Sequence, residues 1–162
     1  MTADSAISRV ALKQLTPDVS AAMSALHREA VAAARAAGVE SDLLELVRIR
    51  ASQINGCAFC LDMHTKDARA KGESEQRVYA LDAWRETPFY TDRERAALAL
   101  TEAVTLVTDG RVPDAVYQEA ASVFKEDELA AVLWAAIVIN TYNRIAISTR
   151  MAPGGYQPAP TA

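Results

Sequence analysis

The sequence contains very little sulfur and very little imidazole, with two cysteines and two histidines among its 162 residues. It also lacks any block of lysine and arginine, and its formal net charge is −4. Proteins that bind nucleic acid or anionic membranes usually carry basic patches, because those surfaces attract positive charge. We therefore expect neither nucleic acid nor a membrane to be the main partner.

Targeting signals are also missing from the sequence pattern. The first residues, MTADSAISRVALKQL, lack the basic start and apolar stretch of a secretory signal. The longest apolar run, Leu129–Ile139, is too short to span a bilayer and ends at Asn140, so we expect a buried core helix there. These absences favour a cytoplasmic protein. In that reducing compartment, a cysteine pair is more often catalytic or metal-binding than a structural disulfide.

Length and composition indicate one globular domain, residues 1–162, in which 51% of the residues are hydrophobic and 23% are charged. No stretch alternates apolar and polar residues long enough to predict a β-strand. The fold class is therefore predicted to be all-α, a compact multi-helix bundle with its core at about residues 17–148. The segment 151–162 is rich in Pro, Gly and Ala, and we expect a flexible tail or an arm that contacts a neighbouring subunit.

Prolines, glycines and capping residues mark the expected helix boundaries. Pro17 is typical of a first helical turn, and Gly38 is typical of a helix end. Thr91 with Glu94 has the pattern of a capping box. We expect helices at about 17–37, 41–54, 57–72, 74–84 and 91–107, a short helix from 113, and a long one at 126–148.

Both cysteines and one histidine lie within the segment NGCAFCLDMHTK, residues 55–66. On a helix, spacings of three and four residues place Cys57, Cys60 and His64 on one face. Two Cα atoms three residues apart on a helix are separated by about 5 Å, which a disulfide tolerates. The cysteine pair is therefore predicted to open and close a disulfide without unfolding the chain.

The local sequence also predicts activation of the thiols. Asn55-Gly56 is expected to place Cys57 in the first turn of a helix, where free N–H groups and the helix dipole favour a thiolate. His64 is expected to hold or relay the proton of Cys60, one turn before it. An ordinary thiol, with a pKa of about 8.5, is only about 3% ionised at pH 7. The cluster is expected to lower that pKa, although the dipole favours Cys57 and the histidine favours Cys60.

Glu45 is the candidate carboxylate that orients His64. It lies between Leu44 and Leu46 on the helix before the cysteine segment. Because a short break separates the two helices, they are expected to pack as a hairpin with Glu45 facing His64. An alternative is that Glu45 is only the third residue of a capping box that Asp42 opens.

Other interpretations of the cysteine pair are weaker. Zinc requires four ligands, and only the distant His27 or a carboxylate would complete the set, so no metal is expected. Attached haem requires a histidine directly after the second cysteine, where the sequence has Leu61. A structural disulfide across so short a loop would restrict the unfolded chain little. Two ordinary core cysteines also fit the pattern, but the spacing favours dithiol redox chemistry.

Several further polar and aromatic residues are not expected to take part in chemistry. His27 is expected to be solvated. Asn140 and Arg144 share a helix face that suits a polar contact between helices. Four aromatic residues are expected to serve packing: Trp84, Phe89, Tyr90 and Trp134.

The segment ELVRIRASQINGCAFCLDMHTKDARAKGE resembles the core motif of the alkylhydroperoxidase D-like branch of the carboxymuconolactone decarboxylase family, E-x11-C-x2-C-x3-H. The four motif positions are Glu45, Cys57, Cys60 and His64. The stretch VLWAAIVINTYNRIAI is similar to the last core helix of that family. The resemblance therefore covers roughly Leu43–Ile147.

The resemblance implies an all-helical fold that assembles as trimers or as hexamers built from them. It also implies a thiol-dependent peroxidase in which Cys60 attacks the peroxide and Cys57 resolves the sulfenic acid as a disulfide. Glu45, His64 and an ordered water would relay the proton. No bound cofactor is implied, since the lipoyl group of a partner protein or another thiol would supply electrons, and a peroxiredoxin would be a further partner.

One position departs from the family's best-known member, which has a second histidine where this sequence has Phe59. The loss of that proton carrier predicts slower turnover and leaves the reductant open. The first alternative is a non-enzymatic oligomeric redox sensor or binding protein. A carboxymuconolactone-type decarboxylase is the weaker alternative, because the decarboxylating branch of the family works without this cysteine pair.

Overall fold

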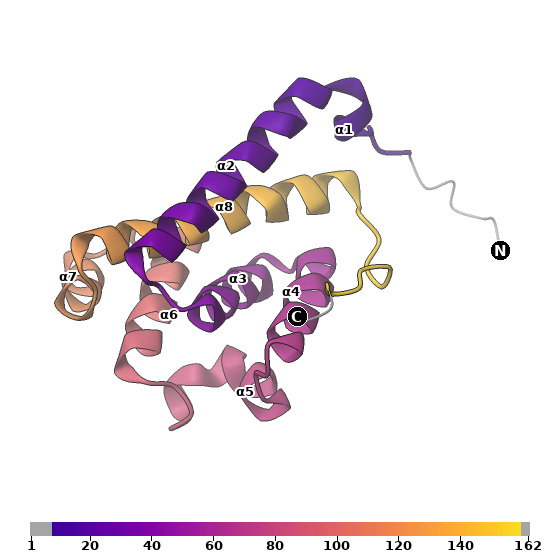
Figure 1. Ribbon diagram of the computed structural model, residues 1–162. Coiled ribbons are helices and arrows are strands. Elements are labelled where there is room, and N and C mark those ends of the chain that lie inside the picture. Colours follow the sequence, from indigo (N-terminus) through magenta and orange to yellow (C-terminus); the bar gives the residue numbers. More distant parts are fainter. Residues whose placement is uncertain (1–7, 160–162) are drawn as a thin grey trace.

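The computed structural model describes residues 8–159, and these form helices, turns and loops without any β-strand (Figure 1). The prediction of an all-α fold is therefore confirmed. In chain order the helical segments are α1 (Leu12–Leu15), α2 (Pro17–Ala37), α3 (Ser41–Asn55), α4 (Ala58–Ala70), α5 (Glu75–Ala80), η1 (Leu81–Glu86), α6 (Asp92–Thr105), α7 (Asp114–Val123) and α8 (Glu126–Thr149).

Most helix boundaries agree with the sequence-based expectations. α2 begins at Pro17, and Gly38 ends it with a left-handed backbone (φ = 78°). α6 begins with the expected capping box, in which Thr91 Oγ1 accepts the N–H of Glu94 and the Glu94 carboxylate accepts the N–H of Thr91. The four-residue α1 has no counterpart among the expectations, because no side chain caps it.

The helix expected at 74–84 is wrong as one continuous element. Ser74 caps α5 by accepting the N–H of Arg77, but α5 ends at Ala80 and the chain continues as the 3₁₀ helix η1. Within η1, Ala83 departs from helical geometry (φ = −107°, ψ = 30°). Trp84, directly after this kink, is buried in the core as predicted.

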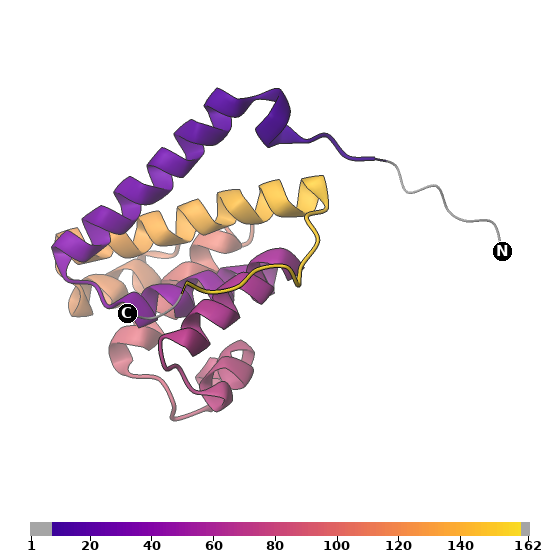
Figure 2. The same cartoon turned by 45° about the vertical axis from the view of Figure 1, so that its right-hand side comes forward.

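α3 is the central helix of the bundle, and it packs against α4, α6 and α8 (Figure 2). Its apolar side chains are buried along most of its length: Leu43, Leu44, Leu46, Val47, Ile49 and Ala51. The same helix buries the polar residues Glu45 and Ser52. Buried polar groups require hydrogen-bond partners, so these two positions mark where polar side chains of the packed helices must gather.

α8 contains the apolar run Leu129–Ile139 and is the longest helix among the described residues. By length and hydropathy it meets the criteria for a membrane span, but half of its apolar window is buried inside the chain, as in the expected core helix. Trp134 on this helix is 45% exposed, so it does not pack in the core of its own chain. The prediction that it serves packing is therefore wrong for the single chain. Tyr90 is buried as predicted, and Phe89 packs against the same cluster.

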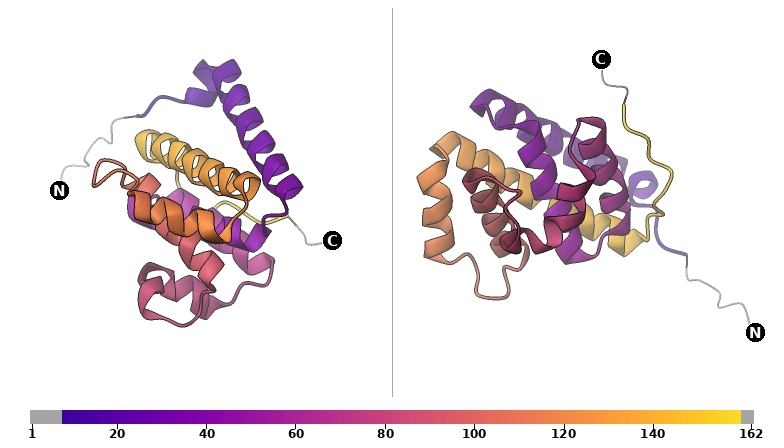
Figure 3. Two further views of the ribbon diagram at one scale, coloured as in Figure 1. Left: turned by 90° about the vertical axis from the view of Figure 1, so that its left-hand side faces the viewer. Right: turned by 90° about the horizontal axis from the view of Figure 1, so that it is seen from below.

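α1 and the start of α2 extend away from the bundle, and the rest of α2 lies across α8 (Figure 1 and Figure 3). Ala34, near the end of α2, is the fully buried residue of this helix. Leu15, Val19 and Leu26 expose their apolar side chains. Exposed apolar surface of this kind is typical of contacts with other protein chains.

The segment after α8 runs back along α4 (Figure 2). The N–H of Gly154 donates to the Asp62 carboxylate at 2.9 Å, and the Tyr156 hydroxyl donates to Asp67 at 2.6 Å. Lys66 Nζ donates to the carbonyl of Tyr156 at 3.0 Å. Within one chain, this part of the expected tail or arm therefore contacts its own α4. The last three residues of the tail lie outside the described part of the chain.

Candidate active site

A tight turn between α3 and α4 places the first cysteine against α3. Gly56 ends α3 with a left-handed backbone (φ = 68°), which glycine adopts without a steric penalty. The N–H of Cys57 then donates to the carbonyl of Ser52 at 3.0 Å and satisfies one of the last carbonyls of α3. Cys57 itself is the N-cap residue of α4. The prediction that it lies within the first helical turn is therefore wrong by one residue.

The two cysteines are unbonded thiols, and each residue is only 1% exposed. The N–H of Cys60 donates to Sγ of Cys57 at 3.4 Å, so the Cys57 sulfur receives an N–H group at the start of α4. Both cysteines pack in one apolar cluster with residues of α3 and α8: Ala51, Ile139 and Ala146, with Phe59 and Tyr142 at its margin. Their spacing along the chain is compatible with a disulfide.

Glu45 and His64 form the carboxylate–imidazole contact that the sequence predicts. Oε2 of Glu45 lies 2.9 Å from Nδ1 of His64, across the interface of α3 and α4. The side chain of Glu45 is 4% exposed and that of His64 is 8% exposed. No side chain caps the start of α3, where Glu40 is the N-cap residue. The alternative in which Asp42 and Glu45 form a capping box is therefore wrong.

Two cations that the sequence reasoning missed complete the surroundings of Glu45. Nη1 of Arg48 and Nζ of Lys71 each donate to Oε1 of Glu45 at 2.8 Å. Burial of Glu45 raises its pKa, but the His64 hydrogen bond, the Arg48 charge and the Lys71 hydrogen bond outweigh burial and lower it to about 2. Glu45 is therefore a carboxylate at neutral pH. Helical spacing was the available signal for Arg48, which lies three residues after Glu45.

Cys60 lies in a less favourable setting for a thiolate than the sequence predicts. Burial is the main cause that raises the pKa of its thiol, to about 12; the neighbouring Cys57 thiol adds to the rise, and a hydrogen bond with Asn143 opposes it. The expectation of a lowered thiol pKa is therefore wrong for Cys60, because burial outweighs that single hydrogen bond. Among the hydrogen bonds of residues 8–159, none joins His64 directly to either sulfur.

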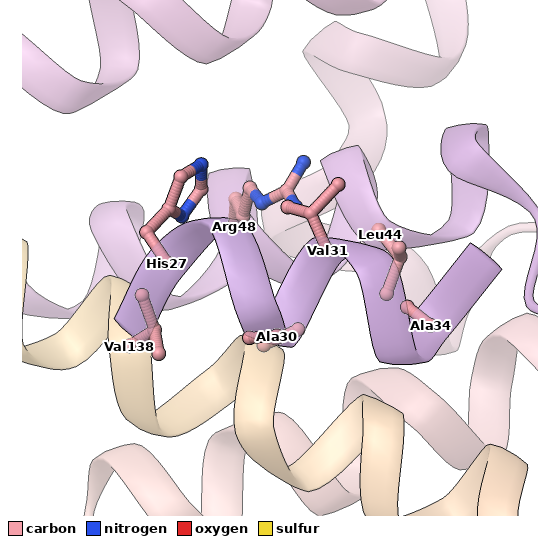
Figure 4. Close-up of a pocket in the computed structure, with 8 residues that line it drawn as sticks. His27, Ala30, Val31, Ala34, Leu44, Arg48 and Val138 are labelled. Carbon is pink, nitrogen blue, oxygen red and sulfur yellow. The ribbon is translucent and has the colours of Figure 1, made fainter. Parts of the chain in front are cut away.

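His27 is half-buried, so the expectation that it is solvated is wrong. Its ring meets the ring of Tyr142 edge-on, with the centroids 5.7 Å apart. Burial, followed by the charges of Arg48 and His64, lowers the pKa of His27. With Arg48 it lines a small pocket between α2, α3 and α8, whose other walls are apolar: Ala30, Val31, Ala34, Leu44, Ala135 and Val138. In Figure 4 the side chains of His27 and Arg48 point to the same side of α2.

A group of potential metal ligands overlaps this site. Within the described part of the chain, the group consists of Glu45, His64 and Asp67, whose ligand atoms lie within 4.8 Å of one another. It contains neither cysteine, although the zinc alternative depends on both. The oxygens of Glu45 are already hydrogen-bonded to His64, Arg48 and Lys71, and these two cations would repel a metal ion.

Asn140 and Asn143 are buried polar residues of α8 that contact other helices. Asn55 Nδ2 donates to Oδ1 of Asn140 at 2.9 Å, and Asn140 Nδ2 donates to Thr105 Oγ1 at 2.9 Å. The predicted polar contact between helices is thereby confirmed for Asn140. Arg144 instead donates to Asn140 within α8.

Comparison of sequences identifies relatives of the chain. The sequence profile of the Carboxymuconolactone decarboxylase family matches residues 17–103, more than half of the chain. The uncharacterized protein YdfG of Bacillus subtilis (strain 168) is 49% identical over 104 residues, which cover 64% of this chain and 71% of YdfG. The uncharacterized protein YnjA of Escherichia coli (strain K12) is 33% identical over 84 residues, which cover 52% of this chain and 46% of YnjA.

Solved structures with the same fold include a protein of unknown function from Agrobacterium tumefaciens, whose name links it to the antioxidant defence protein AhpD. It is 36% identical, with a TM-score of 0.84 over 92% of this chain and 99% of that chain. The debrominase Bmp8 is 18% identical, with a TM-score of 0.73 over 88% of this chain and 74% of Bmp8. An uncharacterized peroxidase-related protein from Silicibacter sp. TM1040 is 22% identical, with a TM-score of 0.68 over 83% of this chain and 69% of that one.

The similarity to Bmp8 and to the Silicibacter protein concerns the fold alone, because the sequence identities are low. The Agrobacterium tumefaciens structure spans nearly the whole of both chains, so it supports the expected alkylhydroperoxidase D-like architecture. From the profile match and the identity to YdfG, the chain belongs to the carboxymuconolactone decarboxylase family, and its fold is of the alkylhydroperoxidase D-like type.

Proposed function

We propose that this protein is a thiol-dependent peroxidase that reduces peroxides through Cys57 and Cys60. The observation that carries the proposal is the buried Glu45–His64 contact of 2.9 Å, which lies on the same two-helix unit as both thiols. A carboxylate-oriented imidazole near a nucleophile is an arrangement suited to general acid–base catalysis. The similarity to a structure named for antioxidant defence supports the same assignment.

In the proposed reaction, the Cys60 thiolate attacks one oxygen of the peroxide and the O–O bond breaks. Cys60 becomes a sulfenic acid, and the other oxygen takes up a proton and leaves as water or an alcohol. Cys57 then attacks the sulfenic sulfur, which forms the Cys57–Cys60 disulfide and releases water. The two thiols together lose two electrons, and the peroxide gains them.

The raised pKa of Cys60 requires that its proton be removed during the attack. We assign His64 as the base. The ionised Glu45 holds the Nδ1 proton of the imidazole, so that Nε2 is the proton-accepting atom. Because the described hydrogen bonds do not join His64 to a sulfur, the proposed link is the ordered water that the family resemblance implies.

Regeneration of the thiols requires a reductant for the Cys57–Cys60 disulfide. The proposed donor is a lipoyl group on a partner protein, or another thiol, and no cofactor is bound to this chain. A peroxiredoxin is a further proposed partner. Thiol–disulfide exchange of this kind suits the cytoplasm, which is the proposed compartment.

Exposed apolar residues support a proposed homo-oligomer, either a trimer or a hexamer. Leu15 and Val19 lie on the extended N-terminal arm, and Trp134 and Ile137 lie on the outer face of α8. Large apolar side chains that gather on a surface favour contact with another chain. Sedimentation of the purified protein measures the state of assembly.

The activity test follows peroxide consumption with dihydrolipoamide as the electron donor. Cys60→Ser is expected to abolish turnover, and His64→Gln is expected to slow it strongly. Without any added thiol, Cys57→Ser is expected to consume one peroxide per chain and then stop, because the sulfenic acid has no resolving thiol. Unchanged turnover in Cys60→Ser protein would overturn the proposal.

The burial of both thiols favours a second candidate function, an oligomeric redox sensor or binding protein without turnover. A sensor of this kind forms one disulfide per chain after peroxide treatment and shows no steady-state rate with any thiol donor. Its assembly or partner binding changes with oxidation. A decarboxylase, the third candidate, would release carbon dioxide from a lactone acid equally well in Cys57→Ser and Cys60→Ser protein.

A further inference from the structure

Asn143 on α8 is a fully buried amide that lies beside the thiol pair. The hydrogen bonds of its side chain go to Asn55 and Ser52, and its proximity lowers the pKa of the Cys60 thiol against the effect of burial. Ile139 and Ala146, about one turn to either side on α8, pack in the same cluster as both cysteines. This face of α8 is therefore one wall of the dithiol site, and Asn143 is the polar residue within it.

Neighbouring hydrogen bonds determine which end of the Asn143 amide faces the sulfur. Nδ2 of Asn55 donates to Oδ1 of Asn143 at 2.8 Å, so the carbonyl end is occupied. Nδ2 of Asn143 donates one hydrogen to Oγ of Ser52 at 3.0 Å. The hydroxyl hydrogen of Ser52 is used at the carbonyl of Arg48, at 2.7 Å, so Ser52 acts as the acceptor. The second N–H of Asn143 is therefore the group that remains for Cys60.

We propose that Asn143 is a further catalytic residue of this site, which donates its free N–H to the Cys60 sulfur as the thiolate forms. A hydrogen bond to a charged acceptor is stronger than one to a neutral acceptor, so this donor favours the thiolate over the thiol. His64 takes the proton away, whereas Asn143 holds the negative charge that remains. The part played in turnover rests on the proposed peroxidase function, but the contact with the thiolate does not.

The other groups near Cys60 leave this role to Asn143. Arg48 is engaged with Glu45, and the Tyr142 hydroxyl donates to the carbonyl of Met23 at 3.4 Å. Of the groups that influence the ionisation of Cys60, Asn143 is the one that lowers its pKa. The titratable groups packed in the cluster of Cys60 are Cys57, at the start of α4, and Tyr142 of α8. His64, one turn after Cys60 on α4, belongs to a second group with Glu45 and Arg48 of α3 and His27 of α2.

The experiment compares Asn143→Leu with Asn140→Leu in the full-length chain. Asn140 is a matched control because it is a buried amide one turn earlier on α8, which bonds Asn55 and Thr105. The rate of iodoacetamide alkylation at Cys60 is measured across neutral and alkaline pH, with assignment by mass spectrometry. Loss of the Asn143 donor is expected to displace the pH profile of Cys60 alkylation upward by about 1 pH unit and to slow alkylation near neutral pH about tenfold.

A merely structural role predicts a different result. Looser packing opens the site; because burial is the main cause of the raised pKa of Cys60, it speeds alkylation and displaces the pH profile downward. Asn140→Leu is expected to show this downward change or none. Ser52→Ala keeps the Asn143 amide but removes its fixed acceptor, so it is expected to displace the profile in the same direction by less, about twofold to threefold in rate. This variant keeps the test available if Asn143→Leu does not fold.

An unchanged Cys60 profile in Asn143→Leu, or in Ser52→Ala where the first variant does not fold, would overturn the inference. An equal displacement in Asn140→Leu would overturn it too. Peroxide consumption is measured on the same samples. If the unmodified protein shows no turnover while Asn143→Leu displaces the alkylation profile, the peroxidase proposal fails and the thiolate contact stands.

Discussion

Nδ1 of His64 lies 2.9 Å from Oε2 of Glu45, and the two residues belong to helices α3 and α4, which are joined by a turn of two residues. The same turn contains Gly56 and presents Cys57 as the N-cap residue of α4. Local backbone geometry thus sets both the thiol pair and the interface at which the carboxylate meets the imidazole. Changes that open this hairpin are expected to affect both parts of the site together.

Glu45→Gln is expected to slow peroxide consumption about a hundredfold, because a neutral amide does not stabilise the imidazolium that forms when His64 accepts a proton. Steady-state kinetics at neutral pH measures the change. A matched control is Glu102→Gln, which also alters a partly buried carboxylate but lies outside the site, where it accepts hydrogen bonds from Arg50, Trp84 and Arg85. Equal slowing in both variants would contradict a specific role for Glu45.

Stability is expected to fall in acid, because Glu45 must be ionised to hold its partners. Its pKa in the folded chain is lowered from the ordinary value of 4.5 to about 2. Its contribution is therefore complete above about pH 4.5 and is lost as the pH falls toward 2. The full contribution to the free energy of unfolding is about 3 kcal/mol. Urea denaturation across this pH window measures the loss.

Glu45→Gln is also the control for this pH dependence. Other carboxylates with lowered pKa values, Glu102 among them, contribute to acid unfolding in both proteins. The difference between the unmodified protein and Glu45→Gln isolates the part that belongs to Glu45. Parallel loss of stability in the two proteins would show that Glu45 does not contribute.

Features encoded within one or two turns of chain were predictable from the sequence. Pro17, Gly38 and the capping box of Thr91 and Glu94 act on neighbouring backbone groups, and all of them lie where the sequence predicts. The contact between Glu45 and His64 was also predictable, because a short turn leaves the two helices few ways to pack.

Contacts between distant segments were not predictable in the same way. Asn143 reaches Cys60 from the last helix, and no spacing in the sequence indicates that pair. The sign of the pKa change at Cys60 was wrong for the same reason, since it depends on burial by several helices rather than on the helix that carries the thiol. His27 is half-buried because α2 lies across α8, which its own polar neighbours do not reveal.

Gly56→Ala is expected to lower the free energy of unfolding by about 1 kcal/mol. The cost arises from the backbone, because φ at this position is 68° and an added Cβ would meet no atom within 4 Å. Gly155→Ala is the control, since that glycine has no such backbone angle and equally open space. Urea denaturation of both variants makes the comparison, and an equal change in the two would contradict the assignment of strain to Gly56.

Arg48 and Lys71 donate to the same oxygen of Glu45 at the same distance of 2.8 Å, yet their removal is expected to have unequal effects. The Arg48 side chain is 13% exposed, whereas that of Lys71 is 37% exposed. Removing one partner of a buried pair costs about 3–5 kcal/mol, while an exposed pair contributes about 0–1 kcal/mol. Arg48→Met is therefore expected to reduce the free energy of unfolding by several times more than Lys71→Met.

The two variants are also expected to differ in acid. The charge of Arg48 is a stronger cause of the lowered pKa of Glu45 than the hydrogen bond of Lys71. Loss of Arg48 should therefore raise the pKa of Glu45 more, so that acid unfolding of Arg48→Met begins at a higher pH than that of Lys71→Met. Urea denaturation of both variants at neutral and acidic pH tests the two effects. The prediction is contradicted if both variants lose the same free energy of unfolding at neutral pH and unfold in acid at the same pH. Burial of the cation would then not determine how strongly it stabilises Glu45.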